Sequence, residues 1–270
     1  MTLIVRDANT FDVVERELAR GTGDVPELPK LAKEALELAQ KAELQADEFV
    51  ELADRDPVVT ARLLAVANSA LYARSVPTAT IKNAFLRIGL QASRDVLYQV
   101  AYGAMLDAPR ELRHEIALTY EHGVRTARIV RRLASRFSLD PQTAFLAALL
   151  HDFGRARCLR IATRRCKNAP QSEIAAAVEQ FHATAGSQLA SAWNLPVEVR
   201  EVCSVHHEPG TNKLAALVAL CDLLEHATAD DAQEPNVNIV DKSFEYLSVS
   251  AEECEEFINL ARAEKQEHME

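Results

Sequence analysis

The stretch AFLAALLHDFGRARC, residues 144–158, sets an imidazole and a carboxylate side by side at the end of an apolar run. Seven small or apolar residues precede His151 and Asp152, and Gly154 follows them. The large apolar residues fall at helical spacing, so the stretch predicts a buried helix that ends in two polar side chains. A single histidine in such a place is usually a hydrogen-bonded core residue. The meaning of the pair therefore depends on the polar residues of the other helices.

The composition of the 270-residue chain predicts an all-α protein. Hydrophobic residues make up 48% and charged residues 26%, which is the balance of a globular protein with a sizeable core. Aromatic residues account for only 6%, glycines number eight, and no series of segments alternates strictly between apolar and polar residues. Half-buried strands would show that alternation, so the sequence favours helices.

The net charge and the cysteines limit the partners and the cellular location that we expect. A net charge of −10 opposes general binding to nucleic acid or to an anionic membrane, so we expect neither partner. Basic residues gather over 125–136 and 154–167, although such runs are usually solvated helix faces. Five cysteines without a CxxC pair suit reduced thiols, and the sequence shows neither a signal peptide nor eighteen consecutive apolar residues. These features predict a soluble cytoplasmic protein.

Capping residues indicate where several helices begin or end. The clearest starts are Asp56 with Pro57, Asp140 with Pro141, and Ser250 with Glu253 three residues later. We also expect Asp47 to cap a short helix, Gly89 to end another, and the next helix to begin near Ser93. A longer helix is predicted over about 111–136.

Seven histidines and aspartates share the apolar sides of the predicted helices. They are His122, His151, Asp152, His182, His206, His207 and Asp222. Neutral imidazoles and carboxylates suit divalent transition ions such as iron, manganese, nickel or zinc, and a carboxylate such as Asp152 can bridge two of them. Two such ions would lower the pKa of a bridging water and align a phosphate ester for attack. The sequence thus predicts one or two metal ions, whereas His114 and His226, which have charged neighbours, are predicted to be surface residues.

Each member also has a structural interpretation when it is taken alone. His122 could lie on a helix surface, and His182 could be a core residue paired with an acid or a carbonyl group. Consecutive side chains point about 100° apart on a helix, so packing needs only one of His206 and His207. Asp222 argues more strongly for a site, because an isolated buried carboxylate is costly without a partner.

The order His, His-Asp, His, His-His, Asp resembles the HD superfamily of metal-dependent phosphohydrolases. The chain as a whole resembles the signalling branch of that superfamily, the bacterial HDOD (HD-related output domain) family, over about residues 25–226. The matching segments are DPVVTARLLAVANSALYA (56–73), TIKNAFLRIGLQASRDVL (80–97), AFLAALLHDFG (144–154), FHATAGSQLASAWNLPVEV (181–199) and HHEP (206–209). The part before about residue 110 distinguishes HDOD domains from ordinary HD enzymes.

The resemblance implies an HD-domain-like helical bundle with an additional N-terminal helical part. It predicts an N-terminal extension over residues 1–24, an HDOD domain over 25–226, and an acidic linker with a C-terminal helix over 227–270. Within the domain, residues 25–110 would form the N-terminal helical part and residues 111–226 the HD-like core. Such domains often serve as output or adaptor modules in signal transduction, and many members are thought to have lost hydrolysis.

The chain departs from related families in two respects. Every position of the metal-ligand pattern holds a residue able to bind metal, which an inactive member would not need. After HHEP the chain reads GTNKLAALV, without the Gly-Tyr-Pro segment of the HD-GYP cyclic-di-GMP phosphodiesterases. Arg155 stands where those enzymes commonly place a lysine. Its guanidinium could hold a phosphate bidentately, although a surface arginine after a helix end is an equal alternative.

The resemblance leaves two functional hypotheses open. The first is a regulatory module that relays a signal through contacts with signalling proteins supplied in trans, with the metal pocket as a relic or a ligand sensor. The second is a metal-dependent phosphohydrolase or phosphodiesterase that acts on a nucleotide or another phosphorylated small molecule, with Asp152 and Arg155 as catalytic residues. The habit of the family favours the first, and the retained ligands favour the second.

Overall fold

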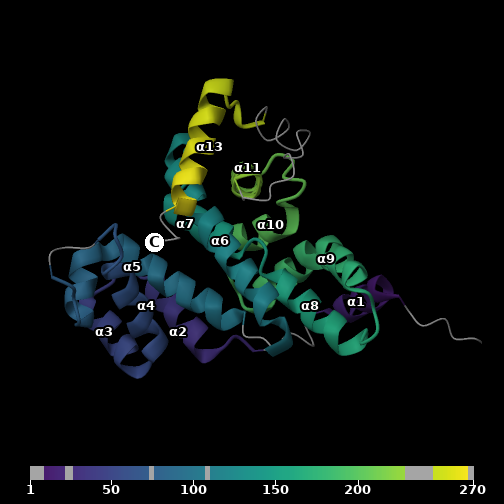
Figure 1. Cartoon of the computed structure of the whole chain (residues 1–270), viewed down its shortest axis with the longest axis horizontal. Helices are drawn as coiled ribbons and strands as arrows, with labels where there is room; N and C mark the ends of the chain where they lie inside the picture. Colours follow the sequence, from purple (N-terminus) through teal and green to yellow (C-terminus); the bar gives the residue numbers. More distant parts are fainter. Residues whose placement is uncertain (1–8, 22–26, 73–75, 107–109, 229–245, 267–270) are drawn as a thin grey trace, which may run out of the picture. The chain divides into compact units, whose positions relative to one another are not determined.

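The computed structural model describes residues 9–21, 27–72, 76–106, 110–228 and 246–266. Their regular structure is helical and these residues contain no strand, which confirms the predicted all-α class (Figure 1). Among them, every helix is too short or too polar to cross a membrane. The chain divides into two compact units. One comprises Met1–Glu27 and Ala108–Ile258, and the other comprises Leu28–Asp107 and Asn259–Glu270.

In the unit that contains residues 28–107, three helices pack on the long helix α5 (Ile81–Met105). They are α2 (Lys30–Ala39), α3 (Ala46–Arg55) and α4 (Pro57–Ala67). The predicted start of α4 is confirmed, because Asp56 accepts a hydrogen bond of 2.8 Å from the backbone N–H of Val58 and Pro57 takes the first helical position. Fully buried side chains such as Phe49 and Leu97 form the core of this unit.

Two predicted boundaries in this unit are wrong. Asp47 does not cap α3, because Gln45 takes that position and its backbone N–H donates to the Glu48 carboxylate at 3.2 Å. This pair starts the helix earlier, and Asp47 lies within the first turn. Gly89, with a φ of 79°, separates two helical segments of α5 as predicted, but the second segment resumes before Ser93.

The other unit is built around an apolar central helix. Its helices are α1 (Thr10–Ala19), α6 (Arg113–Ala134), α7 (Pro141–Leu150), α8 (Gly154–Arg165), α9 (Gln171–Ala192), α10 (Val197–Val205), α11 (Lys213–Ala227) and the first half of α13 (Ala251–Gln266). Helices α6, α10 and α11 all contact α7, and α8 and α10 both pack on α9. Because α7 is contacted from several sides, every residue from Ala144 to Leu150 is buried.

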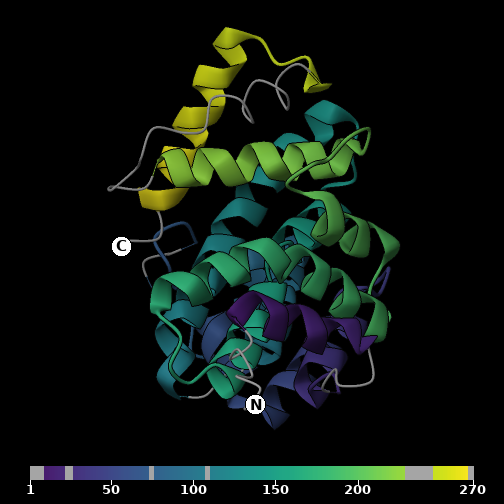
Figure 2. The same cartoon turned by 90° about the vertical axis from the view of Figure 1, so that its right-hand side faces the viewer.

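The first and last helices of the chain also contribute to this unit. Helix α1 packs on α8 and α9 (Figure 2), and the backbone N–H of Thr10 donates to the Glu173 carboxylate at 2.7 Å. Helix α13 has the predicted capping box, in which Ser250 and Glu253 exchange hydrogen bonds of 2.8 and 3.2 Å. Much of the predicted N-terminal extension and acidic linker, namely residues 1–8, 22–24 and 229–245, lies outside the described residues.

Candidate metal centre

Helix α7 carries His151 and Asp152 into the interior of its unit. Asp140 begins the helix, as predicted, by accepting a hydrogen bond of 2.7 Å from the backbone N–H of Thr143. The helix ends at Leu150, so the two polar residues follow at its buried end. His151 is fully buried and Asp152 is 6% exposed. Both side chains therefore need polar or ionic partners.

Gly154 lets helix α8 approach helix α9 closely enough to bring His182 beside Asp152. A Cβ atom on Gly154 would lie 2.1 Å from the backbone oxygen of His182 and 2.4 Å from the backbone nitrogen of Gly186. Both distances are far below van der Waals contact, so only glycine fits between the two helices. His182 Nε2 consequently lies 3.1 Å from Asp152 Oδ1.

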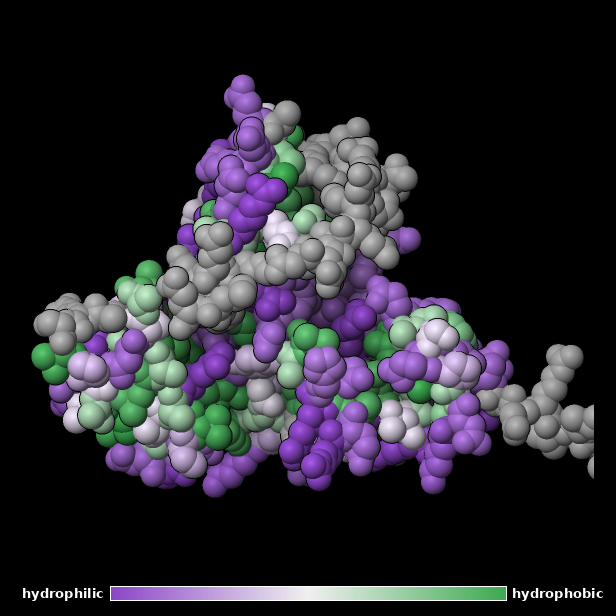
Figure 3. Space-filling view, viewed as in Figure 1, coloured by the Kyte–Doolittle hydropathy of each residue, from purple (hydrophilic) through white to green (hydrophobic). Residues whose placement is uncertain are grey.

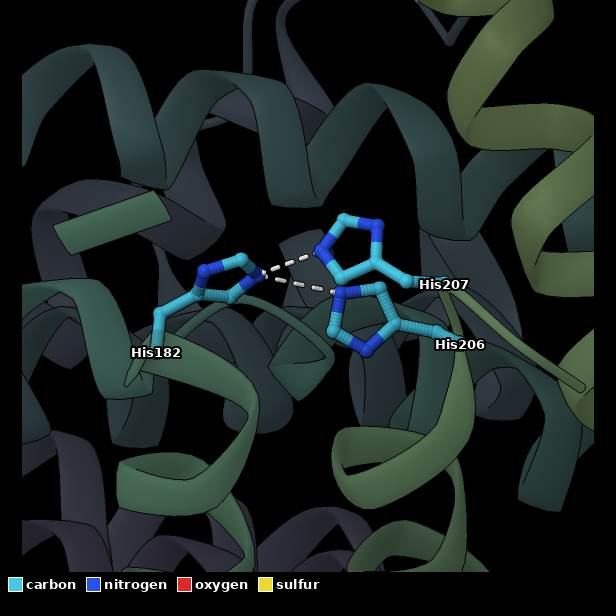
Figure 4. Close-up of side chains that lie close together, drawn as sticks. All are labelled: His182, His206 and His207. Atoms are coloured by element: carbon cyan, nitrogen blue, oxygen red, sulfur yellow. Dashed lines mark hydrogen bonds between the residues drawn. The ribbon is translucent and has the colours of Figure 1, made fainter. Parts of the chain in front are cut away.

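His182, His206 and His207 form the first group of potential ligands. His182 lies on α9, and the other two directly follow α10. Figure 4 shows the three rings turned toward one another, with His182 Nε2 3.2 Å from His206 Nε2 and 2.8 Å from His207 Nε2. Asp152 Oδ1 lies 3.4 Å from His206 Nε2. The three imidazoles are close enough to share one ion, since their ligand atoms lie within 4.8 Å of one another.

His122, His151 and Asp222 form the second group. His122 Nε2, on α6, lies 3.0 Å from Asp222 Oδ1, on α11, and 3.3 Å from His151 Nε2. Asp222 Oδ1 lies 3.8 Å from His151 Nε2, and Asp152 Oδ1 is also 3.8 Å from that atom. The Asp152 carboxylate therefore lies between the two groups and contacts both.

Hydrogen bonds at Nδ1 fix the tautomer of four buried rings. The partners are oxygen atoms of a backbone carbonyl or a carboxylate, which only accept hydrogen bonds, so Nδ1 must carry the hydrogen. The distances are 2.7 Å from His151 to Ala148, 3.1 Å from His182 to Val178, 3.1 Å from His206 to Val202, and 2.7 Å from His122 to Glu225.

This tautomer leaves a lone pair on Nε2 whenever the ring is neutral. The Nε2 atoms of His122 and His151 face each other at 3.3 Å, and those of His182 and His206 face each other at 3.2 Å. Two acceptors repel at these distances unless a cation lies beside them, and the nearby carboxylates add further acceptors. The residues therefore fit a metal ion, with the Nδ1 hydrogen bonds orienting the rings as they do in histidine metal sites.

In the absence of metal, protons on the histidines supply part of the positive charge that the carboxylates need. Burial alone would lower the pKa of His122, but the carboxylates of Asp222 and Glu225 raise it to about 10. Burial lowers the pKa of His151 to about 4, so this ring stays neutral beside the charged His122. Burial would raise the pKa of the Asp152 carboxyl. His151, which is charged only in the acid range where this carboxyl titrates, and hydrogen bonds with His182 and His206 instead hold that pKa well below its usual range. Asp152 is therefore an anion at neutral pH and a competent metal ligand.

Arg155 lies at the edge of the centre. One nitrogen of its guanidinium, Nη1, lies 3.4 Å from Asp152 Oδ2 and 2.9 Å from Glu179 Oε2. The side chain is 29% exposed, so an anion that approaches the centre from solvent can reach it.

All seven predicted ligand residues converge, and two further residues join them. Glu225, which is 7% exposed, binds His122. His226 is exposed, as predicted, but its ring stacks on that of His122 with 4.7 Å between the centroids. His114 is also exposed, as predicted. The sequence does hold a signal for the roles of Glu225 and His226. They follow Asp222 by three and four residues, which places them on the same face of the helix as Asp222.

Comparisons with known proteins agree with this architecture. The HDOD domain model matches residues 25–209. An uncharacterized protein of Treponema pallidum (strain Nichols) is 25% identical over 198 residues, which cover 68% of this chain and 38% of that protein. This chain thus spans well under half the length of that relative.

Two solved structures share the fold at low sequence identity. A proposed metal-dependent phosphohydrolase from Shewanella amazonensis SB2B is 20% identical with a TM-score of 0.70, covering 95% of this chain and 99% of that one. An HDOD domain protein with unknown function from Geobacter sulfurreducens is 20% identical with a TM-score of 0.63, covering 94% and 96%. Because the matching family model also covers more than half of the sequence, this chain belongs to the HDOD domain family.

Proposed function

We propose that this chain is a signal-transduction output module whose pocket binds one or two divalent transition metal ions. The observation that carries the proposal is the convergence of Nε2 atoms from four buried rings whose Nδ1 atoms already donate to oxygen. Iron, manganese, nickel and zinc all accept such imidazole ligands together with carboxylates.

Each group of ligands would hold one ion. His182, His206 and His207, the first group, would hold one ion, and His122, His151 and Asp222, the second group, would hold the other. Asp152 would serve both, since its Oδ1 lies 3.8 Å from His151 Nε2 and 3.1 Å from His182 Nε2. Bound ions of this kind supply Lewis acidity and a water of lowered pKa. The residues themselves fix the rings and keep most of the pocket away from solvent.

Contacts with signalling proteins, supplied in trans in the cytoplasm, would transmit the output. The unit of residues 28–107 exposes large apolar side chains, as the green areas over α3 to α5 in Figure 3 illustrate. Val58, Leu71, Val76 and Leu86 are each at least 56% exposed, and two of them line one surface hollow with Arg87. Exposed apolar side chains that gather in one region fit a protein partner. The net charge of −10 makes nucleic acid or an anionic membrane a poor alternative.

Phosphoester hydrolysis is a second candidate, and the position of Arg155 is the observation that favours it. A guanidinium beside a metal-binding carboxylate could hold a phosphate bidentately. The substrate would be a nucleotide or another phosphorylated small molecule, with Asp152 and Arg155 as the catalytic residues. Turnover of simple phosphoesters by the metal-loaded wild type, and its loss in Arg155→Gln, would favour the enzyme. A metal-loaded wild type without turnover would favour the module.

Metal content tests the pocket itself. Protein purified without chelator, and reconstituted with iron, manganese, nickel or zinc, should retain metal. Content below roughly 0.2 ion per chain after reconstitution would contradict the proposal on mass-action grounds. An ion that binds only the native state at a hundredfold excess over Kd adds about 2.7 kcal/mol of stability. In a domain of this size that corresponds to a rise in Tm of roughly 5–10 °C.

If Asp152 bridges two ions, its loss should weaken metal binding more than the loss of His207. Asp152→Ala should abolish or strongly weaken binding of both ions because it removes a shared ligand, whereas His207→Ala should have a smaller effect. Thermal shifts of wild type and both variants, each with metal and with chelator, measure this order. If Asp152 is instead a structural carboxylate, metal will shift neither protein and the substitution will lower stability in chelator by leaving its partners unpaired. An equal metal-induced shift in wild type and Asp152→Ala would contradict the bridge.

A further inference from the structure

His226 lies against the group formed by His122 and Asp222, although the HD pattern of ligands does not include it. Its ring stacks on that of His122 with 4.7 Å between centroids and 25° between planes. Its Nε2 atom lies 3.4 Å from Asp222 Oδ1. One ligand atom from each of these three residues lies within 4.8 Å of the other two. A single ion could therefore contact all three side chains.

Packing does not force His226 into this position. The side chain is 67% exposed and belongs to the last turn of α11, so the ring could also extend into water. It is instead directed at Asp222, whose Oδ1 atom is buried. Although His122 Nε2 is 3.0 Å away, that oxygen forms no hydrogen bond of good geometry within the part of the chain that the structure describes. An ion held between Asp222 and His226 would give this buried oxygen a partner of good geometry.

We propose that His226 is an additional ligand of the metal ion held by His122, His151 and Asp222. This inference rests on the proposed metal pocket and extends it. Each ion would then receive three imidazoles, and the Asp152 carboxylate would be shared. Three nitrogen ligands favour iron, nickel or zinc over magnesium or calcium, which prefer oxygen.

The exposure of His226 gives it a property that the other ligands of this ion lack. His122 is 8% exposed and His151 is fully buried, so neither ring can leave without disturbing the core. His226 can swing into water by rotating its side chain. It is therefore the ligand that a water molecule or a phosphate oxygen of a small-molecule ligand would replace most readily.

Co²⁺ titration of the chelator-stripped chain, followed by visible absorption, tests the assignment. His226→Gln removes the imidazole but keeps a polar side chain, and His114→Gln is the matched control because His114 is an exposed histidine of the same unit. We expect His226→Gln to bind one ion at least about tenfold more weakly and to alter the spectrum of bound Co²⁺. His114→Gln should behave as wild type. In chelator, all three proteins should melt within about 2 °C of one another, which verifies an intact fold.

The possible outcomes separate this inference from the proposed function. Equal Co²⁺ affinity and an unchanged spectrum in His226→Gln would overturn the inference and leave the pocket in place. Equal weakening by His226→Gln and His114→Gln would also overturn it, because loss of a surface histidine rather than of a ligand would then be the cause. If wild type takes up no Co²⁺, the inference and the proposed pocket both fail.

Discussion

Replacing Gly154 with alanine should push helices α8 and α9 apart and disable the metal centre. The new Cβ atom would lie 2.1 Å from the backbone oxygen of His182, whereas ordinary contact begins at 3.4 Å. Because the second atom that it meets, in Gly186, is also backbone, the helices must separate by roughly 1 Å. Overpacking of this kind costs about 1–3 kcal/mol, and the higher helix propensity of alanine offsets up to about 1 kcal/mol. The net loss of about 1–2 kcal/mol would lower Tm by roughly 2–8 °C.

Thermal unfolding in chelator measures the packing cost, and metal content after reconstitution measures the effect on the centre. Gly186→Ala is the control on the facing helix, because its Cβ would meet Cys203 and Phe153 at 3.4 and 3.5 Å, which are ordinary contacts. We expect this control to unfold within about 2 °C of wild type and to keep its metal. If Gly154→Ala also unfolds at the wild-type temperature and binds metal normally, the close packing of α8 on α9 does not position His182.

Two further predictions concern pH and substrate. Burial alone would lower the pKa of His122, but the carboxylates beside it raise that pKa to about 10. Metal must therefore displace a proton from this ring. The apparent affinity for metal should rise between pH 7 and about 9, by up to about tenfold per pH unit. Chelator competition at several pH values measures this, and a flat profile would contradict the proton displacement. Hydrolysis of cyclic-di-GMP should be weak or absent, because GTNKLAALV replaces the Gly-Tyr-Pro segment after HHEP. Turnover of roughly 1 per second or faster by the metal-loaded protein would refute this expectation.

Local sequence was sufficient for the helix starts at Asp56, Asp140 and Ser250, because a cap depends on residues that are neighbours in the chain. Asp56 and Asp140 bind the backbone of the helices they start, as predicted. Asp47 failed because Gln45 and Glu48 offer an equally local start two residues earlier. When two adjacent caps compete, their chemistry is nearly equivalent and the sequence alone does not decide between them.

The sequence could predict only those residues of the candidate centre that lie on apolar faces of the helices. Glu225 and His226 were missed because CDLLEH resembles an exposed helix end. Whether that end meets His122 depends on how α11 packs on α6, a contact between residues 103 positions apart in the case of Glu225. The role of Gly154 was hidden for the same reason, since the backbone that excludes a side chain there belongs to α9.

The rings of His151, His182 and His206 are hydrogen-bonded to carbonyl groups three or four residues earlier in the chain, within the helix that each residue belongs to or directly follows. The direction of each ring is thus set by the helix that carries it, and little side-chain rotation is left to absorb a change in helix spacing. A shift of α7, α9 or α10 by a fraction of an ångström would pass directly into the distances between the nitrogen atoms. Metal affinity would then depend on the spacing of these helices. A protein that docks on them and displaces one helix would change how tightly the ion is held.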